Sequence, residues 1–502
     1  MTDFTKTLLA VIIAATLVGT AALLRPTALE DARFSDQGEL FFTAFTDPLA
    51  PASLEVVAFD ANSASFEPFK VEKRDGRWVI PSHHNYPADA AENMAKAASA
   101  FIGLTKEQVV SDRAADHESL GVLAPDDPHA PLSGRGTRVT LRDANGGELA
   151  SLIIGLPAPD PTGASAGGQA TPRRYVRAPD TARVYAVQFP TTFSTRFADW
   201  VETDLLQLEG KRIDRLLVDR YEVDERAGER KVIERLSLSR VLPAPVAPDA
   251  PKWTAQCQPP QAGDRSDVVN NARVDEALSA LADLKIVGVR PKPPALADAL
   301  AGKASNVGQA DYLDLQARGF FVTRDGKFVA NEGEVTATAE DGVVYNIAFG
   351  EVLFGRDEEL SAGVVRDKSE TAEGDGPSAG TESRYALVRV SFDPLLFPEP
   401  APPPPAEPGA EPSGEDGQPP AQAREADAAQ KEYERLRAER DANIAAGKAR
   451  ADALTRRFAD WYFVIDAKSF AALRPTCAEV TTAPASEQAP AVGPQGPLAP
   501  GS

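Results

Sequence analysis

The chain has 502 residues, of which 43% are hydrophobic and 25% are charged, and this length suffices for two to four domains with buried cores. Asp and Glu number 74 against 53 Lys and Arg, which gives a formal net charge of -21. A surface this acidic repels the phosphates of nucleic acids and the headgroups of anionic lipids, so we exclude nucleic-acid binding.

The first predicted element is a membrane segment at Leu8–Leu24, an uncharged apolar run near the minimum length that spans a bilayer. Small residues near Ala21 would suit signal-peptide cleavage, but Leu23 and Leu24 continue the apolar run, which favours an uncleaved anchor. We therefore expect a cytoplasmic tail and transmembrane anchor in residues 1–26, a juxtamembrane segment in residues 27–52, and an extracytoplasmic remainder.

The stretch that follows predicts an α+β unit with antiparallel hairpins. Asp75-Gly76 supplies the positive φ angles of a tight hairpin turn, and this hairpin should direct Trp78 into the core. Apolar residues at helical spacing follow Pro87. The predicted elements are a strand at 54–59, a hairpin at 66–80, a helix at 87–102, a hairpin at 138–154, a strand at 175–187 and a helix at 191–206.

The chain contains an internal repeat. Five residues recur unchanged: Arg196, Phe197, Ala198, Asp199 and Trp200 in the first half, and Arg457, Phe458, Ala459, Asp460 and Trp461 in the second. Other matches follow the same order, namely Val139-Thr140 with Val335-Thr336, Ile154-Gly155 with Phe349-Gly350, and Arg174-Tyr175 with Arg384-Tyr385. Trp253 stands in the second half where Trp78 stands in the first. Several matches in order indicate two copies of one folded unit.

The repeated pentapeptide is expected on a helix. Arg196 and Asp199 are three residues apart, as are Phe197 and Trp200, so a helix would form an ion pair beside an aromatic pair. We interpret the pentapeptide as a core wedge that seats the helix on its sheet, since a wedge is needed once per unit. The alternative is a partner-binding face.

An insertion interrupts the second copy. Residues 398–420 are rich in proline, which predicts an extended linker without a packed core, and the charged, alanine-rich stretch from Ala421 predicts a solvated helix. The fold class is thus α+β, with two tandem repeats of antiparallel sheet and packed helices after one transmembrane helix. The predicted boundaries are repeat 1 at 53–210, repeat 2 at 211–396, the inserted linker and helix at 397–456, the end of repeat 2 at 457–481, and a disordered tail at 482–502.

Four histidines are the first candidates for chemistry. His83 and His84 with Asp89 or Glu92 would offer imidazole and carboxylate ligands for zinc, but the spacing matches no compact metal motif. We favour loop packing or helix capping there, a solvated turn for His117 and a loop for His129. No serine has the Gly-x-Ser-x-Gly setting, and no phosphate-binding loop is present. We assign no catalytic, cofactor-binding or metal-binding residue.

The two cysteines, Cys257 and Cys477, both lie in the second copy. An exported location would permit a disulfide between them, whereas low cysteine usage also suits a reducing compartment. The sequence leaves both readings open.

The order of short motifs resembles the family of unknown function DUF4340. The motifs are Gly76-Arg77-Trp78-Val79-Ile80, Tyr86-Pro87-Ala88-Asp89, Leu120-Gly121-Val122, Ile154-Gly155 and Arg174-Tyr175-Val176. In two copies the resemblance spans Ser53 to Pro475. It implies a bacterial protein of the cytoplasmic membrane with one span and an extracytoplasmic bulk, associated with gliding-motility-type ABC transporter components. The family brings no catalytic residues.

We expect a non-enzymatic, membrane-tethered scaffold or accessory subunit of an envelope complex, with a protein partner and no cofactor. One alternative is an exported hydrolase whose carboxylates converge only in three dimensions. The other is an envelope ligand-binding protein that uses a groove between the repeats.

Overall fold

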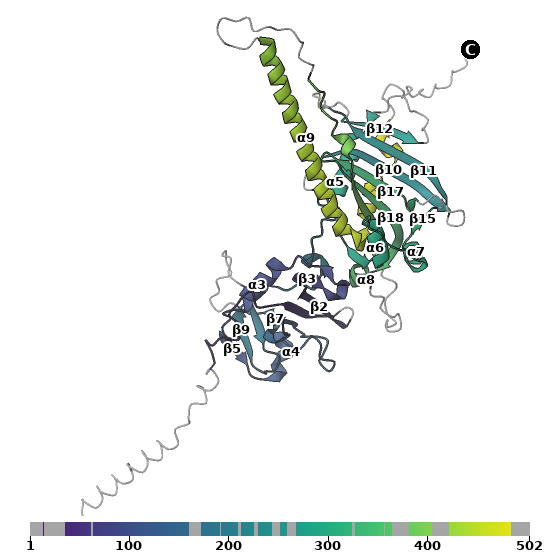
Figure 1. The fold of residues 1–502 in the computed structure, drawn as a ribbon. Coiled ribbons are helices and arrows are strands. Elements are labelled where there is room, and N and C mark those ends of the chain that lie inside the picture. Colours follow the sequence, from purple (N-terminus) through teal and green to yellow (C-terminus); the bar gives the residue numbers. More distant parts are fainter. Residues whose placement is uncertain are drawn as a thin grey trace, which may run out of the picture. The chain divides into compact units, whose positions relative to one another are not determined.

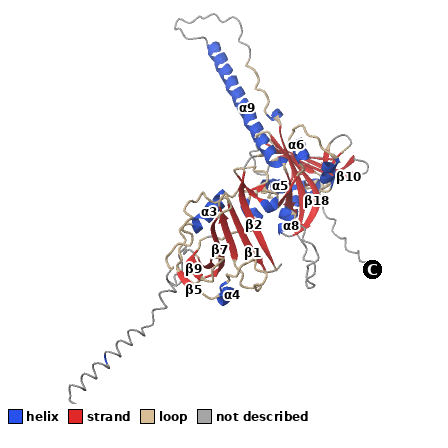
Figure 2. Ribbon diagram, turned by 60° about the horizontal axis from the view of Figure 1, so that its bottom comes forward, coloured by secondary structure: helices blue, strands red, loops and turns tan. Residues whose placement is uncertain are grey.

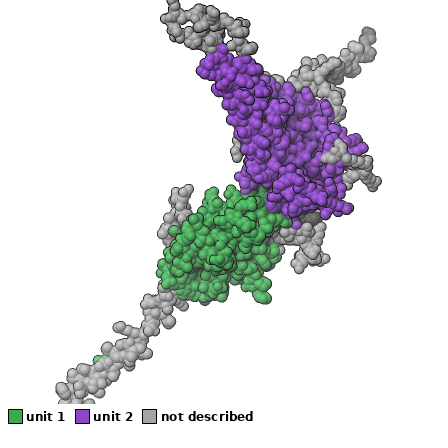
Figure 3. All heavy atoms as spheres, in the orientation of Figure 1, with its two compact units in different colours: residues 1–201 green, residues 202–502 purple. Residues whose placement is uncertain are grey.

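The chain divides into two compact units, unit 1 at residues 1–201 and unit 2 at residues 202–502 (Figure 3). The computed structural model describes Ala14 and residues 36–61, 64–159, 172–190, 192–208, 212–224, 229–242, 252–258, 268–323, 327–355, 357–363, 381–403 and 421–482. The predicted membrane segment at Leu8–Leu24, apart from Ala14, and the tail after Thr482 lie outside these residues. Within them, no helix combines the length and the apolar character that crossing a membrane requires.

Unit 1 is built on a nine-stranded antiparallel sheet of order β4-β3-β2-β1-β6-β7-β8-β9-β5 (Figures 1 and 2). Its strands are β1 (Ser53–Asp60), β2 (Ser65–Arg74), β3 (Arg77–Ile80), β4 (Tyr86–Pro87), β5 (Gln108–Ser111), β6 (Thr137–Arg142), β7 (Glu148–Pro157), β8 (Arg173–Arg177) and β9 (Val184–Gln188). Its helices are α3 (Ala91–Phe101), α4 (His117–Leu120) and the 3-10 turns η1 (Pro81–His83), η2 (Ala114–Asp116) and η3 (Phe197–Trp200).

The helix α3 forms where the helical spacing predicts it. It buries Met94, Ala97, Ala98 and Phe101, which lie on one stripe of the helix. The predicted hairpin at residues 66–80 is confirmed as β2 and β3, joined through Asp75 and Gly76, which both have positive φ. Local turn chemistry and hydrophobic spacing therefore determine this part of unit 1.

Residues 36–45 belong to unit 1, although the sequence placed them in a separate juxtamembrane segment. Leu40 bridges Thr105, and the Phe41 N–H donates to the Leu104 carbonyl at 2.9 Å. The ring of Phe42 lies 5.6 Å from that of Phe101, and Phe45 is buried. Aromatic side chains in this short segment thus complete the core of unit 1.

Unit 2 contains an eight-stranded antiparallel sheet of order β12-β11-β10-β17-β18-β19-β20-β14. Its strands are β10 (Ile213–Asp224), β11 (Glu229–Arg240), β12 (Trp253–Gln258), β14 (Gly288–Pro291), β17 (Glu334–Ala339), β18 (Val343–Gly355), β19 (Thr381–Phe392) and β20 (Trp461–Asp466). Two small sheets pair β13 (Val268–Val269) with β21 (Thr481–Thr482), and β15 (Phe320–Val322) with β16 (Phe328–Ala330).

Helices of unit 2 lie against this sheet, whereas α9 extends well beyond it (Figure 2). They are α5 (Asn271–Ala282), α6 (Pro294–Leu300), α7 (Gln309–Gln316), α8 (Asp357–Ala362), α9 (Ala421–Ala459), α10 (Ala467–Leu473), α11 (Cys477–Val480) and the 3-10 turn η5 (Pro394–Leu396). α9 has 39 residues and a length of about 58 Å. Its last turns bury Ala451, Leu454 and Phe458. Just before the proline run, the Phe397 carbonyl accepts a hydrogen bond from Arg440 of α9.

Eight strands follow one another in the same order in both sheets. The order β3-β2-β1-β6-β7-β8-β9-β5 of unit 1 corresponds to β12-β11-β10-β17-β18-β19-β20-β14 of unit 2. Local details agree as well. Arg174 donates to the Gly155 carbonyl at 3.2 Å in unit 1, and Arg384 donates to the Gly350 carbonyl at 3.4 Å in unit 2. A register shift follows Ile154 in the first sheet and Phe349 in the second.

The repeated pentapeptide, in contrast, occupies different places in the two sheets. The predicted helix at residues 191–206 is wrong, because only the short turn η3 at Phe197–Trp200 forms there, after β9. In the second half, Ala459 ends α9 and Trp461 begins β20, the counterpart of β9. Five residues carry too little conformational preference to override their surroundings, so the same sequence ends a helix in one unit and forms a turn in the other.

The tryptophans of the two edge hairpins correspond but differ in burial. Trp78 lies opposite Lys73, whose Nζ is 6.0 Å from the ring centroid, and Trp253 lies opposite Arg240, whose Cζ is 4.5 Å from the ring centroid. Trp253 is 1% exposed, whereas Trp78 is only half-buried. Trp78, expected to point into the core, is thus less buried than its counterpart Trp253.

Because the two tryptophans differ in burial, replacing each with alanine should lower the free energy of unfolding by different amounts. Trp253→Ala should lower the free energy of unfolding by about 3–5 kcal/mol, because it empties a buried site. Trp78→Ala should lower it by only about 1 kcal/mol. Urea unfolding followed by circular dichroism measures both, and equal losses would contradict the burial difference.

Candidate functional site

Two buried cations lie at the edge of the unit 2 sheet, on β14 and just after it. Arg290 donates to the carbonyls of Glu359, Leu360 and Ser361 at 2.9–3.0 Å, at the end of α8. The Glu359 carbonyl also accepts from the Gly363 N–H at 3.1 Å, and a cation at this end of the helix is favoured by the helix dipole. Arg290 thus fixes the end of α8 against the sheet.

Lys292 performs the same task for α9. It is 6% exposed, and its Nζ donates to the carbonyls of Phe458 at 2.8 Å and Ala459 at 3.1 Å. Its own N–H donates to the Asp460 carbonyl at 2.8 Å. Burial lowers the pKa of Lys292 to about 7, while the nearby Asp460 carboxylate opposes this shift.

A tyrosine cluster lies beside these cations. Tyr462 of β20 is fully buried, and its hydroxyl donates to Asp314 of α7 at 2.9 Å. The guanidinium of Arg318 lies 4.7 Å from the Tyr462 ring centroid and also pairs with Asp314. The ring of Phe320 stacks on Tyr462 at 5.8 Å. Burial, followed by the Asp314 carboxylate, raises the pKa of Tyr462.

A small hollow adjoins this cluster on the side of α7 and β15. It has a volume of about 260 Å³ and is lined by Tyr312, Leu315, Gln316, Phe320, Phe321 and Val322. Leu315 and Phe320 also belong to the apolar cluster that contains Tyr462. Tyr462 therefore lies next to the hollow, whose lining combines apolar side chains with polar groups.

The buried Lys292 and Tyr462 side chains hold neighbouring elements of unit 2 together. Both Lys292 and the Tyr462 hydroxyl direct their hydrogens at fixed protein oxygens, whereas a catalytic acid, base or nucleophile must reach the reacting atoms of a substrate. The arrangement fastens α7 and α9 to the edge of the sheet.

The two aromatic residues of the pentapeptide in unit 1 lie in the core of that unit. Phe197 and Trp200 are buried, and the Trp200 Nε1–H donates to the Ser194 carbonyl at 2.9 Å. Asp199 accepts from the Ser194 hydroxyl at 2.5 Å instead of pairing with Arg196.

In unit 2, Phe458 is buried with its ring 5.8 Å from that of Phe463, while Trp461 is half-buried. Arg457 donates to the Asp204 carbonyl at 2.7 Å instead of pairing with Asp460. The aromatic residues of each pentapeptide thus pack within the unit that contains them. The two expected ion pairs, Arg196 with Asp199 and Arg457 with Asp460, do not form.

Two of the histidines, His83 and His117, pack against neighbouring side chains and backbone. His83 is 3% exposed and its ring stacks on Phe197 at 4.3 Å, whereas His84 is exposed. His117, expected on a solvated turn, is buried and its Nε2 bonds to the Ala182 carbonyl at 2.8 Å. Among the residues that the structure describes, no three His, Cys, Asp or Glu side chains are grouped so as to hold a metal ion.

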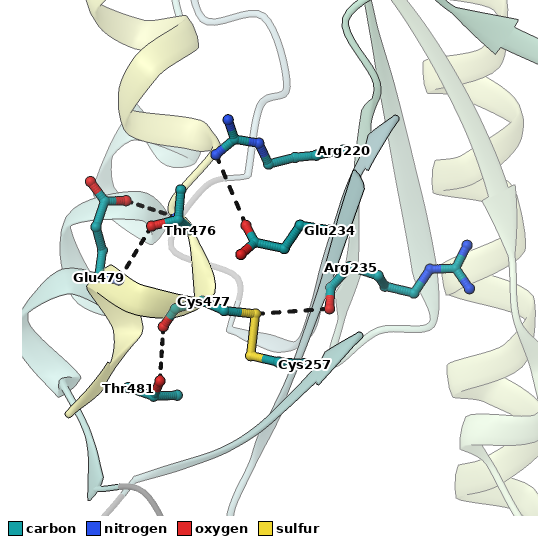
Figure 4. The surroundings of a disulfide bond; sticks show 8 residues. All are labelled: Arg220, Glu234, Arg235, Cys257, Thr476, Cys477, Glu479 and Thr481. Carbon is teal, nitrogen blue, oxygen red and sulfur yellow. Dashed lines mark hydrogen bonds and ion pairs between the residues drawn. A yellow bond between two sulfur atoms is a disulfide. The ribbon is translucent and has the colours of Figure 1, made fainter. Parts of the chain in front are cut away.

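A disulfide joins Cys257 of β12 to Cys477 of α11, with the two Cα atoms 6.1 Å apart (Figure 4). Thr476 and Glu479 form a capping box at the start of α11, and β21 then pairs with β13. The disulfide thus attaches the last described residues of the chain to the edge of the sheet.

A family model matches part of the chain. Residues 78–301 match the model of the family described as Domain of unknown function (DUF4340), which supports the resemblance seen in the short motifs. The matched range begins at β3 of unit 1 and extends to α6 of unit 2. No curated protein and no solved structure matches the chain.

Lys292→Met should remove a pH dependence of stability. The folded state holds Lys292 with a pKa near 7, against 10.5 for an ordinary lysine, so between these values the unfolded state binds more protons. The wild-type free energy of unfolding should therefore gain up to about 1.4 kcal/mol per pH unit from this group between pH 7 and 10. Urea unfolding at several pH values measures it, and parallel curves for the two proteins would contradict the assignment.

His83→Ala should destabilise unit 1 by about 1–3 kcal/mol, because it removes a buried ring stacked on Phe197. His84→Gln is the matched control and should change stability by less than about 0.5 kcal/mol, because His84 is exposed. Thermal unfolding of the two variants measures both effects. Equal stability of both variants and the wild type would show that the stacked ring contributes nothing.

Proposed function

We propose that this protein is a membrane-anchored, extracytoplasmic scaffold or accessory subunit of an envelope complex. It is non-enzymatic, and its large sheets position surfaces for a protein partner. The association with a gliding-motility-type ABC transporter system, and the single span at Leu8–Leu24, rest on the sequence and on the family resemblance.

The Cys257–Cys477 disulfide is the observation that carries this proposal. Disulfides persist in oxidising compartments such as the periplasm and are rare in the cytosol. Both cysteines of the chain are engaged, and Cys477 is fully buried. A structural cross-link of this kind supports an extracytoplasmic location for unit 2.

We further propose that the chain consists of two tandem copies of one α+β unit. The common order of eight strands supports this, as do the paired bonds of Arg174 to Gly155 and of Arg384 to Gly350. The second copy differs by the segment that contains α9. In unit 1 the corresponding connection between β8 and β9 is only residues 178–183.

The shape of α9 supports a scaffolding role. Much of its surface before residue 447 is exposed and charged, and ion pairs such as Asp427–Lys431 and Arg435–Glu439 follow the helical spacing that stabilises an isolated helix. Its second half is attached to the unit, because Arg440 bonds the Phe397 carbonyl and Lys292 bonds the last carbonyls of the helix. A long helix whose first half is mostly exposed suits a subunit that bridges to another protein.

Cysteine alkylation tests the location. In cells opened directly into denaturant with a maleimide-polymer reagent, both cysteines should stay unlabelled, and prior reduction should expose two thiols. The control is the Cys257→Ala variant, which should show one reactive thiol without reduction. Labelling of both cysteines in the unreduced wild type would contradict an oxidising compartment.

Membrane fractionation tests the anchor. The protein should remain with the membrane pellet after high-salt and alkaline washes and dissolve in detergent, as an apolar span requires. Recovery in the soluble periplasmic fraction, with a mature amino terminus near Ala22, would show that the segment is cleaved.

A further inference from the structure

One face of the unit 2 sheet carries a polar row that is open to solvent. The strands β12, β11, β10, β17, β18 and β19 are neighbours in this sheet. Residues directly opposite each other on antiparallel strands point to the same side, so the registers define rows across the sheet. The middle row is Gln256, Ser237, Leu217, Thr336, Asn346 and Arg389. Each of these residues is exposed or partly exposed, and all but Leu217 are polar.

Arginines lie on both sides of this middle row. One flanking row is Thr254, Ser239, Arg215, Thr338, Val344 and Ser391, and the other is Gln258, Arg235, Asp219, Glu334, Ala348 and Leu387. Arg215 is exposed, and Arg230 lies beside the second flanking row, close to Asp219. Together with Arg389 at the end of the middle row, four arginines therefore border a strip of small polar side chains.

Two carboxylates hold three of these arginines in place. Asp219 pairs with Arg235 at 2.6 Å and with Arg230 at 3.4 Å. Glu334 pairs with Arg230 at 3.8 Å and with Arg389 at 3.5 Å. The side chains of Asp219 and Glu334 are 4% and 16% exposed, whereas those of the three arginines are 30–35% exposed. The positive groups are thus nearer the solvent than the negative groups that fix them.

The face is a local exception to the charge of the chain. Its three rows and Arg230 contain four arginines against two carboxylates, while the chain as a whole has a net charge of -21. An anionic group that approaches this face meets cations whose positions are already set by ion pairs. Less side-chain freedom is then lost on binding than with mobile surface lysines.

Unit 1 lacks this set of charges. The matched pairs Val139-Thr140 and Val335-Thr336 align the two sheets residue by residue. The residues of unit 1 at the positions of Asp219, Arg235 and Asn346 are Val57, Pro68 and Ser151. Val57 and Ser151 are also buried. The polar face with its arginines is therefore a property of the second unit and not of the shared fold.

We propose that this face of unit 2 is a docking surface for an extended, acidic segment of a partner protein. The segment lies along the middle row, across the strands. Its carboxylates pair with Arg215 on one side and with Arg235 and Arg230 on the other, and the hydroxyls and amides of the middle row bond its backbone.

Charge and dimensions select this occupant. The middle row crosses six strands and therefore measures about 24 Å, a length that about seven residues of extended chain span. A second copy of the chain brings its own net charge of -21, and two such molecules repel each other. A short acidic segment carries the charge that complements the arginines without this large opposing charge.

The inference rests on the proposed accessory role in expecting a protein partner. Its test is separate from cysteine alkylation and membrane fractionation, so that failure of one leaves the other standing. The probe is a fluorescent, blocked heptapeptide that alternates aspartate with serine, titrated with the full chain in detergent and followed by anisotropy at about 0.05 M salt. The matched probe carries asparagine in place of aspartate.

The aspartate peptide should bind with a Kd on the order of 100 µM, and the asparagine peptide should not bind. Arg230→Gln should weaken binding at least about fivefold, because it removes one of the cations. The control Arg435→Gln removes an arginine of α9 that also pairs with two carboxylates, and it should bind like wild type.

A second pair of variants leaves the ion-pair network intact. Gln258 is exposed and lies opposite Arg235. Gln258→Glu should weaken binding at least about threefold, and Gln258→Lys should tighten it at least about twofold, because only the charge of the face changes. The control Gln430→Glu, at an exposed position on α9, should bind like wild type.

The proposal is overturned by absence of saturable binding, by wild-type binding of Gln258→Glu, or by equal weakening in Gln430→Glu. Tenfold tighter binding after residues 364–380 or 404–420 are replaced by glycine and serine would assign the face to an acidic segment of the chain itself. Displacement of the probe by the soluble headgroup glycerol phosphate, at the concentration of the peptide, would assign it to lipid. Either result also overturns the proposal. Circular dichroism and urea midpoints establish that the Gln258 variants are folded.

Discussion

The inserted helices of unit 2 depend on two cations at the edge of its sheet. Arg290 and Lys292 each donate hydrogen bonds to backbone carbonyls in the last residues of a helix, Arg290 to α8 and Lys292 to α9. Buried carbonyls of this kind are costly to leave without a partner. The position of the two cations next to Tyr462 and Arg318 joins the helix ends to the apolar cluster of α7 and β15. The edge strand β14 thereby organises elements that are distant in the sequence.

The sequence predicts much of the sheet and little of this edge. Tight turns at Asp75-Gly76 and Asn145-Gly146, together with short strands of apolar residues, specify the hairpins and the α+β class because these signals are local. Lys292 has no such signal, because the carbonyls it binds are 166 and 167 residues away. Only the fold brings them together.

The pentapeptide shows that two identical short sequences need not occupy corresponding places in two similar folds. Its two occurrences are the longest exact match in the chain, yet one follows β9 and the other precedes β20. The weaker matches Ile154-Gly155 and Phe349-Gly350 occupy corresponding places, because β7 and β18 bend there and an arginine of the next strand bonds the glycine carbonyl. Backbone geometry at such a bend restricts residue choice more strongly than the surroundings of the pentapeptide do.

The cross-link between Cys257 and Cys477 closes a covalent ring over a sequence separation of 220 residues. That ring contains α9, the proline run and most strands of the unit 2 sheet. A protease that cuts once anywhere inside the ring opens it without releasing a fragment, since both pieces stay joined through the sulfur atoms. A single nick in the inserted segment therefore becomes visible on a gel only after reduction. One cut in this part of the second unit therefore breaks the backbone without removing any residue from the protein.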